Sequence, residues 1–347
     1  KGRKTGQRFG HCSGSSHSMK NVSGCSIGEK SYTIPNDCPY SQMPVPANAR
    51  LRKCPSSPAT RAIATRTASQ TNVEQSFLAY LRGRCRSLPQ VTVGIGDDAA
   101  VITPPSDSLI VCTDQIIEGV DFQLDEHSLG DVGFKSMAIN LSDIAAMGAT
   151  PTAALVTLSL PKQGATRIAG EVYEGILEAA ASCGVAIAGG DISTYSGPLA
   201  ISVTLLGHAP PGQAWLRSGA RDGDAIVVSG AVGGSILGRH LRPQPRLELA
   251  VQLRRLVHVH AAIDISDGLS LDLDRLCAAS GVGAELDVAR IPIHHDAIRL
   301  AESTGRTPLE HAWSDGEDFE LILAMSEQDA GRVCAMDLGV PLTRIGN

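Results

Sequence analysis

Acidic residues recur at six places in this chain, beside apolar runs or within a helical pattern. These places are Asp97-Asp98, Thr113-Asp114, Ser142-Asp143, Gly190-Asp191, Asp264-Ile265-Ser266-Asp267 and Gly316-Glu317-Asp318. Because ligand sites in α/β folds gather beyond the carboxyl ends of strands, we expect these carboxylates to converge. Crowded carboxylates repel one another unless a proton or a metal ion neutralises them. Mg²⁺ usually lies between one or two carboxylates and substrate phosphates, so the pattern predicts Mg²⁺-dependent phosphoryl transfer from a nucleotide.

Each acidic place taken alone also has a purely structural interpretation. Asp267 could cap the helix expected over 268–279, and Gly190-Asp191 could form an ordinary turn. Asp143 is the most informative, because it lies in the apolar helical stretch INLSDIAAMGA, where a charge must be solvated or paired. The joint occurrence of six such places favours one shared site.

The glycine-rich stretch 229–235 and Arg217 each have a functional and a structural interpretation, and the sequence leaves both open. No G-x-x-x-x-G-K-[ST] sequence is present, so a P-loop is not predicted. The glycine-rich stretch 229–235 (SGAVGGS) could receive an anion on its backbone amides or could be a plain tight turn. Arg217 could contact a phosphate, since arginine presents paired donors, or could be a solvated linker charge.

Other kinds of catalytic site find little support in the sequence. The nine cysteines form no C-x-x-C pair, and the short histidine pairs lack a third ligand at a suitable spacing. No G-x-S-x-G sequence indicates a serine hydrolase. Scattered single cysteines are typical of a reducing compartment, so we expect a cytoplasmic protein. No uninterrupted apolar run predicts a membrane span.

The net charge of −6 is unevenly distributed along the chain. Residues 1–70 carry 11 Lys and Arg against 2 Asp and Glu, whereas the remainder carries 19 against 34. This acidic body argues against nucleic acid as the main partner, since that binding needs a basic surface. It suits a protein that collects divalent cations, although solubility alone would also explain it.

The composition divides the chain into three parts. Residues 1–70 are rich in Ser, Pro, Gly and basic residues, so we expect them to be disordered or foreign to the mature domain, with a transit peptide as the alternative. Residues 71–209 and 210–347 are predicted to be two domains, joined by the Pro- and Gly-rich segment 210–224. Because the chain ends on an expected strand, we expect the second domain to be truncated.

Alternating helical and strand patterns predict an α/β (α+β) architecture. The expected strands cover 91–95, 108–113, 153–160, 185–188, 199–207, 225–229, 261–265, 283–288, 319–324 and 340–345. The expected helices cover 73–82, 129–147, 166–182, 233–241, 245–257, 268–279, 296–303 and 327–336. Gly148 and Pro151 provide a stop signal for the second of these helices.

The motifs, taken in order, resemble those of the thiamine-monophosphate kinase family, within the aminoimidazole ribonucleotide synthetase superfamily. They are GIGDDAAV, CTDQIIEGVDF, AINLSDIAAMGATP, AGGD, LRSGARDGD, IDISDGL and DGEDFEL. The resemblance runs from about residue 73 to the end. It implies the two-domain fold of that superfamily, with N-terminal domains pairing as a barrel in a homodimer. It also implies that ATP and Mg²⁺ bind between the domains, and that the γ-phosphoryl group passes directly to thiamine monophosphate, giving thiamine diphosphate.

The resemblance also implies a role for individual residues. Metal ligands would be Asp98, Thr113, Asp114, Asp143, Asp191, Asp264 and Asp267. Nucleotide contacts would be Gly190, Arg217 and Ser266, and substrate contacts would be Asp121 and Glu317. Catalysis would rest chiefly on Asp143, Asp191 and Asp267.

Three positions depart from the family pattern. Cys112 stands where the family has Ser or Thr, Asp121 stands where it has a substrate-contacting His, and Asp315 stands where it has Gly. The departures keep two alternatives open. One is a related ATP-dependent enzyme with another acceptor, and the other is a non-catalytic protein that binds Mg²⁺-ATP.

Overall fold

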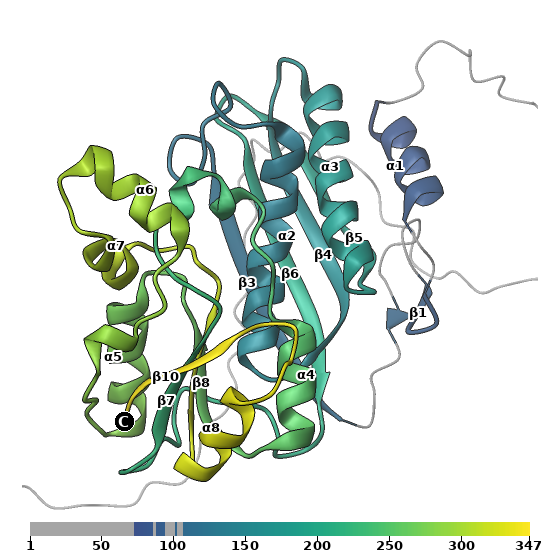
Figure 1. Cartoon of the computed structure of the whole chain (residues 1–347). Coiled ribbons are helices and arrows are strands. Elements are labelled where there is room, and N and C mark those ends of the chain that lie inside the picture. The colour runs from purple at the N-terminus through teal and green to yellow at the C-terminus, as the bar shows by residue number, and fades with distance from the viewer. Residues whose placement is uncertain (1–72, 86–87, 94–100, 103–106) are drawn as a thin grey trace, which may run out of the picture. The chain divides into compact units, whose positions relative to one another are not determined.

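The computed structural model describes residues 73–85, 88–93, 101–102 and 107–347. These residues contain two four-stranded sheets, one two-stranded sheet and the helices labelled in Figure 1. The expectations for residues 1–70, for Asp98 and for the end of strand 91–95 lie outside the described residues. None of the described helices combines the length and apolar character needed to cross a bilayer.

The first four-stranded sheet has the order β3-β6-β4-β5. Its strands are β3 (Ser108–Ile117), β4 (Thr150–Pro161), β5 (Ala186–Tyr195) and β6 (Ala200–Ala209). Strand β6 runs antiparallel to both β3 and β4, whereas β4 and β5 are parallel and are joined through helix α3 (Ala165–Ser182). Helices α2 (Leu129–Ala146) and α3 lie side by side on one face of this sheet (Figure 1).

Helix α2 has clear signals at both ends. The Ser128 side chain accepts a hydrogen bond from the Asp131 amide at 3.1 Å, which caps the first turn. The helix ends before Gly148, whose φ of +61° is left-handed. A Cβ at Gly148 would lie 2.6 Å from the Trp215 ring, so the close packing of Trp215 also requires glycine there.

Short elements precede the first sheet. Helix α1 (Val73–Arg84) contacts α3, and strands β1 (Val91–Val93) and β2 (Val101–Ile102) form an antiparallel pair. The Phe77 and Tyr173 rings meet edge to face, with centroids 5.6 Å apart, and help to attach α1 to α3.

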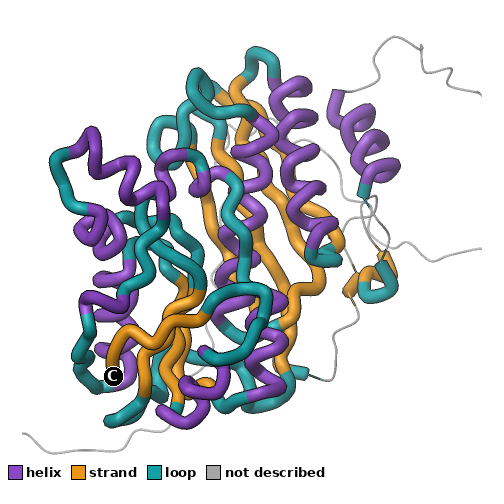
Figure 2. Tube along the Cα trace, in the orientation of Figure 1, coloured by secondary structure: helices purple, strands orange, loops and turns teal. Residues whose placement is uncertain are grey.

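The second four-stranded sheet has the order β10-β7-β9-β8 and is antiparallel throughout. Its strands are β7 (Ala225–Ser229), β8 (Val259–Asp264), β9 (Leu321–Met325) and β10 (Leu342–Gly346). Its α-helices are α4 (Leu247–Leu256), α5 (Leu269–Ser280), α6 (His295–Thr304), α7 (Pro308–Ser314) and α8 (Glu327–Cys334). Short 3₁₀ turns occur at Ser235–Leu237, Arg239–Leu241 and Val288–Arg290. The two sheets form separate groups of orange strands in Figure 2.

One hydrophobic cluster contains side chains from both sheets. Leu141 of α2, Val227 of β7 and Leu323 of β9 all belong to it and are at most 1% exposed. A second cluster lies between α5 and the other face of the second sheet, where Ile263 and Leu273 are buried. The domain boundary between 209 and 210 stays a prediction, because the core is continuous across it.

Most of the expected elements are present, with four corrections. The helix expected over 233–241 is wrong: the segment forms two 3₁₀ turns, separated by Gly238 at a φ of +126°. The strand expected over 283–288 is also wrong, since only an isolated bridge at Leu286 occurs there. Strand β5 continues to Tyr195, well past the expected end at residue 188. Helix α7 was missed, although its Thr307–Glu310 capping box is a recognisable start signal.

Candidate active site

Three carboxylates meet where helix α2 passes between the two sheets. Asp114 belongs to β3, Asp143 to α2, and Asp264 ends β8. The Asn140 side-chain oxygen accepts from the Asp114 amide at 3.1 Å, and Ser142 Oγ donates to Asp264 Oδ2 at 2.7 Å. The segment of α2 from Asn140 to Asp143 therefore gathers acidic residues from both halves of the protein.

The electrostatics of these three groups favour the uptake of positive charge. Burial, assisted by the charges of Asp264 and Asp114, raises the pKa of Asp143 to about 7. Burial also raises the pKa of Asp264 to about 6, against the opposing hydrogen bond from Ser142. The pKa of Asp114 is raised by burial, although its hydrogen bond with Asp143 opposes the shift. Negative charge is therefore costly in this cluster, and a bound cation would relieve that cost.

Arg217 lies close enough to this cluster for its charge to act on it. It is exposed, and its charge lowers the pKa of both Asp143 and Asp264. Its main-chain oxygen accepts a hydrogen bond from Ser280 Oγ at 2.9 Å. The Arg217 guanidinium therefore adds positive charge beside the acidic cluster.

The carboxylates of this cluster fit a metal ion that is held partly by the protein and partly by the phosphates of a bound substrate. Over the residues that the structure describes, no three His, Cys, Asp or Glu side chains are arranged to hold an ion by themselves. Asp114 and Asp143 are two adjoining carboxylates, the number that Mg²⁺ commonly takes from a protein when phosphates and waters complete its shell. The metal roles of these residues stay predictions.

Thr113 and Asp191 do not join the cluster. Successive strand residues point to opposite faces of a sheet, so Thr113 faces away from its neighbour Asp114. Asp191 pairs with Thr157, which pairs with Ser202, and this row lies on the same face as Thr113. The Thr113 hydroxyl lies 3.1 Å from the Val203 oxygen. Both residues would therefore serve a site on the sheet face turned away from α2 and α3.

The interpretation of Gly190-Asp191 as a turn after a short strand is wrong. Both residues lie inside β5 and pair with β4. A Cβ at Gly190 would lie 1.8 Å from the Val156 oxygen, so the contact between the strands requires glycine. The double glycine that suggested a turn instead permits a close approach.

Ser266 and Asp267 lie just beyond Asp264. Ser266 Oγ donates to Asp267 Oδ2 at 3.2 Å, and Asp267 forms an ion pair with Arg275. Asp267 does not cap α5. The capping interpretation is wrong, since the Asp272 carboxylate instead accepts from the amides of Asp267 and Gly268, at 2.9 and 3.2 Å.

The two predicted substrate residues are brought together by a lysine. Lys135 Nζ donates to Glu317 Oε1 at 2.7 Å and to the Asp121 main-chain oxygen at 3.3 Å. The Asp121 carboxylate itself accepts from the Ile117 amide at 2.7 Å, within the turn that ends β3. Lys135 was missed from the sequence. Its signal was that residues 71–347 hold only two lysines, and this one interrupts the apolar pattern of α2.

The glycine-rich stretch 229–235 does receive anions, but they belong to the protein. The Gly233 amide donates to Asp318 Oδ2 at 2.7 Å, and the Gly234 amide donates to Asp315 Oδ2 at 3.1 Å. Burial raises the pKa of Asp318 to about 7, although Gly233 and Arg239 oppose the shift. The stretch therefore holds the 315–318 segment, which contains Glu317, in place.

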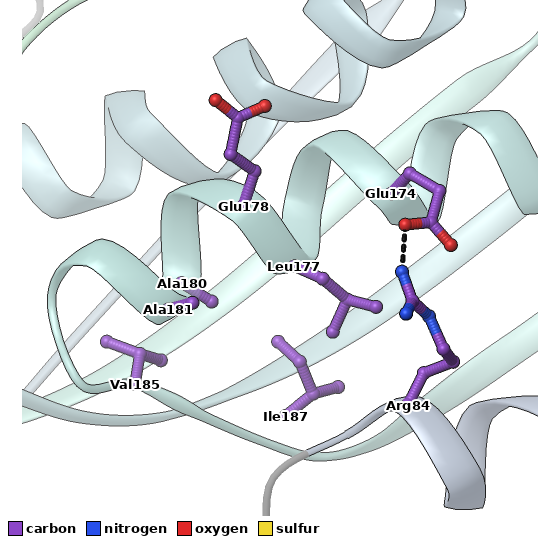
Figure 3. A pocket seen from close by; sticks show the side chains of 8 residues that line it. All are labelled: Arg84, Glu174, Leu177, Glu178, Ala180, Ala181, Val185 and Ile187. Atoms are coloured by element: carbon purple, nitrogen blue, oxygen red, sulfur yellow. Dashed lines mark hydrogen bonds and ion pairs between the residues drawn. The ribbon is translucent and has the colours of Figure 1, made fainter.

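A surface pocket of about 340 Å³ lies elsewhere, against α3 and the start of β5. Figure 3 shows Arg84 of α1 reaching toward Glu174 of α3, with Leu177 and Ile187 beside them. No residue predicted for the active site lines this pocket. The pocket is therefore not the site assembled above.

Comparison with known proteins identifies the family. Residues 96–209 match the AIR synthase related protein N-terminal domain, and residues 217–346 match the corresponding C-terminal domain. A thiamine-monophosphate kinase from Rhodopirellula baltica is 64% identical over 282 residues, which cover 79% of this chain and 89% of that protein. The chain belongs to the thiamine-monophosphate kinase family.

Solved structures agree with this assignment. The thiamine-monophosphate kinase of Stenotrophomonas maltophilia is 34% identical with a TM-score of 0.69, and the match covers 80% of this chain and 93% of that one. A structure described as AaThiL complexed with AMPPCP and TMP is 30% identical with a TM-score of 0.64, covering 73% and 84%. The predicted family and its mixed α/β fold are therefore confirmed.

Proposed function

We propose that this member of the thiamine-monophosphate kinase family phosphorylates thiamine monophosphate with ATP. The γ-phosphoryl group would leave the β-phosphate oxygen of ATP and join a phosphate oxygen of the acceptor, giving ADP and thiamine diphosphate. The observation that carries the proposal is the 64% identity to a thiamine-monophosphate kinase over most of both chains. The complex of a 30% identical relative with AMPPCP, an ATP analogue, and TMP supports the same pair of substrates.

The acidic cluster would serve the nucleotide side of this reaction. Asp114 and Asp143 would hold Mg²⁺, which when bound neutralises charge on the phosphates during transfer. Asp264 adjoins them, and Arg217 would contact the phosphates from the exposed side of the cluster. Catalysis would then rest on positioning and charge neutralisation, with Asp143 as the central residue.

Other residues keep proposed roles that depend on groups beyond this cluster. Ser266 and Asp267 would contact nucleotide and metal from the loop after β8. Thr113 and Asp191 would act on the opposite face of the first sheet, Gly190 would contact the nucleotide from its place beside Asp191 in β5, and Asp98 would act from outside the described residues.

That opposite face also supports a proposal about assembly. Leu109 is 54% exposed and Val111 is 56% exposed, and both lie, like Leu155, on the side of the sheet turned away from α2 and α3. We propose that a second copy covers this face, giving a homodimer in which strands of both copies complete a barrel.

The five described cysteines are all free, which supports a reducing, cytoplasmic location.

The test is an acceptor-specific assay. The full-length protein is incubated with ATP, MgCl₂ and thiamine monophosphate, and thiamine diphosphate is measured by chromatography. Formation of the diphosphate, lost when Mg²⁺ is removed by EDTA, is the expected result. ATP turnover only with other small acceptors would favour the related enzyme. Binding of Mg²⁺-ATP without turnover would favour the non-catalytic protein.

A further inference from the structure

The segment Asp315–Glu320 is fixed by hydrogen bonds along its whole length. The Glu317 amide donates to the Ser266 oxygen at 2.7 Å, and the Phe319 amide donates to the Ile265 oxygen at 2.8 Å. The Gly316 oxygen accepts from Ser235 Oγ at 2.6 Å. The carboxylates on either side of Glu317 are held by the glycine-rich stretch, as described above. The backbone at Glu317 therefore has little freedom to move.

The backbone of this segment is also strained. Glu317 has a φ of +61° and Phe319 a φ of +52°, in a region that non-glycine residues rarely adopt. Such residues persist where the surroundings over-determine them, and they cluster at functional sites. The strain turns the Glu317 side chain toward helix α2, while its carboxylate neighbours point to the glycine-rich stretch.

Lys135 is the partner that meets Glu317, and the two side chains differ sharply in exposure. The Lys135 side chain is 1% exposed, whereas that of Glu317 is 36% exposed. Burying an ammonium group is costly unless it is paired and hydrogen-bonded. The buried Lys135 is therefore a stabilising residue only through its partners, Glu317 and the Asp121 oxygen.

The different side-chain exposures of Lys135 and Glu317 indicate different roles for these two residues. Lys135 is too deeply buried to touch a ligand, so it is not a catalytic residue. The Glu317 side chain is partly exposed while one of its carboxylate oxygens is held by Lys135. A carboxylate oriented in this way can receive a cationic group of a ligand without the entropy cost of being ordered on binding.

We propose that Lys135 is a positioning residue of the acceptor site, which holds the Glu317 carboxylate ready for the positively charged part of the acceptor. The inference rests on the proposed function, since it takes the acceptor to be a cationic heterocycle that carries a phosphate. Lys135 contributes affinity for the acceptor and little for ATP, because the acidic cluster on the nucleotide side gathers around other residues of α2.

The test compares Lys135→Met with Lys162→Met, which replaces the only other lysine of residues 71–347, an exposed one. For each variant, kcat and the KM values of thiamine monophosphate and ATP are measured, and binding of the acceptor is measured by calorimetry. We expect Lys135→Met to raise the KM and Kd of the acceptor about tenfold, the scale of one oriented charged contact. The KM of ATP and all constants of Lys162→Met should stay within about twofold of wild type.

Each other outcome has a definite meaning. Unchanged acceptor constants in Lys135→Met, or equal increases for acceptor and ATP, would overturn the inference while leaving the proposed function intact. A wild-type protein that neither binds nor phosphorylates thiamine monophosphate would refute the proposed function, and the inference with it. If Lys135→Met does not fold, the double variant Lys135→Met/Glu317→Gln removes both charges. Its Kd for the acceptor is compared with that of Glu317→Gln alone. Equal values, both above that of wild type, would support the inference, because Lys135 acts through Glu317. A further rise caused by Lys135→Met, or wild-type affinity in both variants, would overturn it.

Discussion

The carboxyl groups of Asp114 and Asp143 interact directly, although one belongs to strand β3 and the other to helix α2. Two buried carboxylates at one place repel each other unless a proton or a cation neutralises them. Burial, with the charges of Asp264 and Asp114, raises the pKa of Asp143 to about 7. A divalent cation and a proton should therefore compete for this pair of carboxyl groups.

The first prediction concerns pH and magnesium. The folded-state pKa of Asp143, about 7, lies above its ordinary value of 3.8, so the folded protein binds more protons between these pH values. The stability of the metal-free protein should therefore fall as pH rises from about 4 to about 7. Mg²⁺ with an ATP analogue should raise the unfolding temperature more at pH 8 than at pH 5. Calorimetry with and without EDTA measures both effects, and an equal Mg²⁺ effect at the two pH values would contradict the competition.

The second prediction separates activity from stability at Asp143. Asp143→Asn should lower kcat at least about 100-fold, as expected when a group that stabilises transition-state charge is lost. The same change should raise the free energy of unfolding of the metal-free protein at pH 8, because it removes a buried negative charge beside Asp114 and Asp264. Urea unfolding and steady-state kinetics test the two halves. The exposed Asp125→Asn is the control and should change neither quantity, whereas near-normal activity of Asp143→Asn would argue against its role.

The sequence predicted the meeting of Asp114, Asp143 and Asp264 for a sound physical reason. Each of the three carboxylates lies in a strand or helix at a position where its charge must be solvated or paired. These strands and helices alternate as an α/β fold requires. The alternation of strand side chains also implied that Thr113 and Asp114 point to opposite faces, but the expected ligand set did not use this. Side chains of adjacent strand residues cannot serve the same face of a sheet. The expected metal ligands Thr113 and Asp114 therefore had to belong to different faces.

The partners of Lys135 and of the glycine-rich stretch could not be predicted in this way. Lys135 and Glu317 are 182 positions apart, and Gly233 and Asp318 are 85 apart. Such pairs depend on how the two sheets pack, which no local pattern contains. A glycine-rich stretch before a helical turn has the same sequence whether it receives a ligand phosphate or a carboxylate of its own chain.

The third prediction follows from the unequal burial of Lys135 and Glu317. Glu317→Ala leaves an ammonium group buried with one partner fewer, whereas Lys135→Met replaces that group by an apolar side chain of similar length. Glu317→Ala should therefore lower the unfolding temperature more than Lys135→Met does. Thermal denaturation followed by circular dichroism compares the two. A larger loss in Lys135→Met would show that the ammonium group itself contributes more stability than its burial costs.

The last prediction tests whether the glycine-rich stretch holds the acceptor side of the site. Gly234 and Gly212 have nearly the same φ, +74° and +73°, so an alanine at either costs about 1–2 kcal/mol in backbone strain. A Cβ at Gly234 would also lie 2.5 Å from the Ala297 amide nitrogen, whereas a Cβ at Gly212 meets nothing within 4 Å.

Gly234→Ala should therefore destabilise the protein by about 1–3 kcal/mol more than Gly212→Ala, because the packed backbone must shift. The shift would move the amide that holds Asp315, and through it the segment that carries Glu317. We thus expect Gly234→Ala to raise the KM of the acceptor as well, with Gly212→Ala unchanged. Urea unfolding and kinetics on the matched pair decide the matter: equal losses of stability would mean that only the backbone angle matters at Gly234, and an unchanged KM would separate the stretch from acceptor binding.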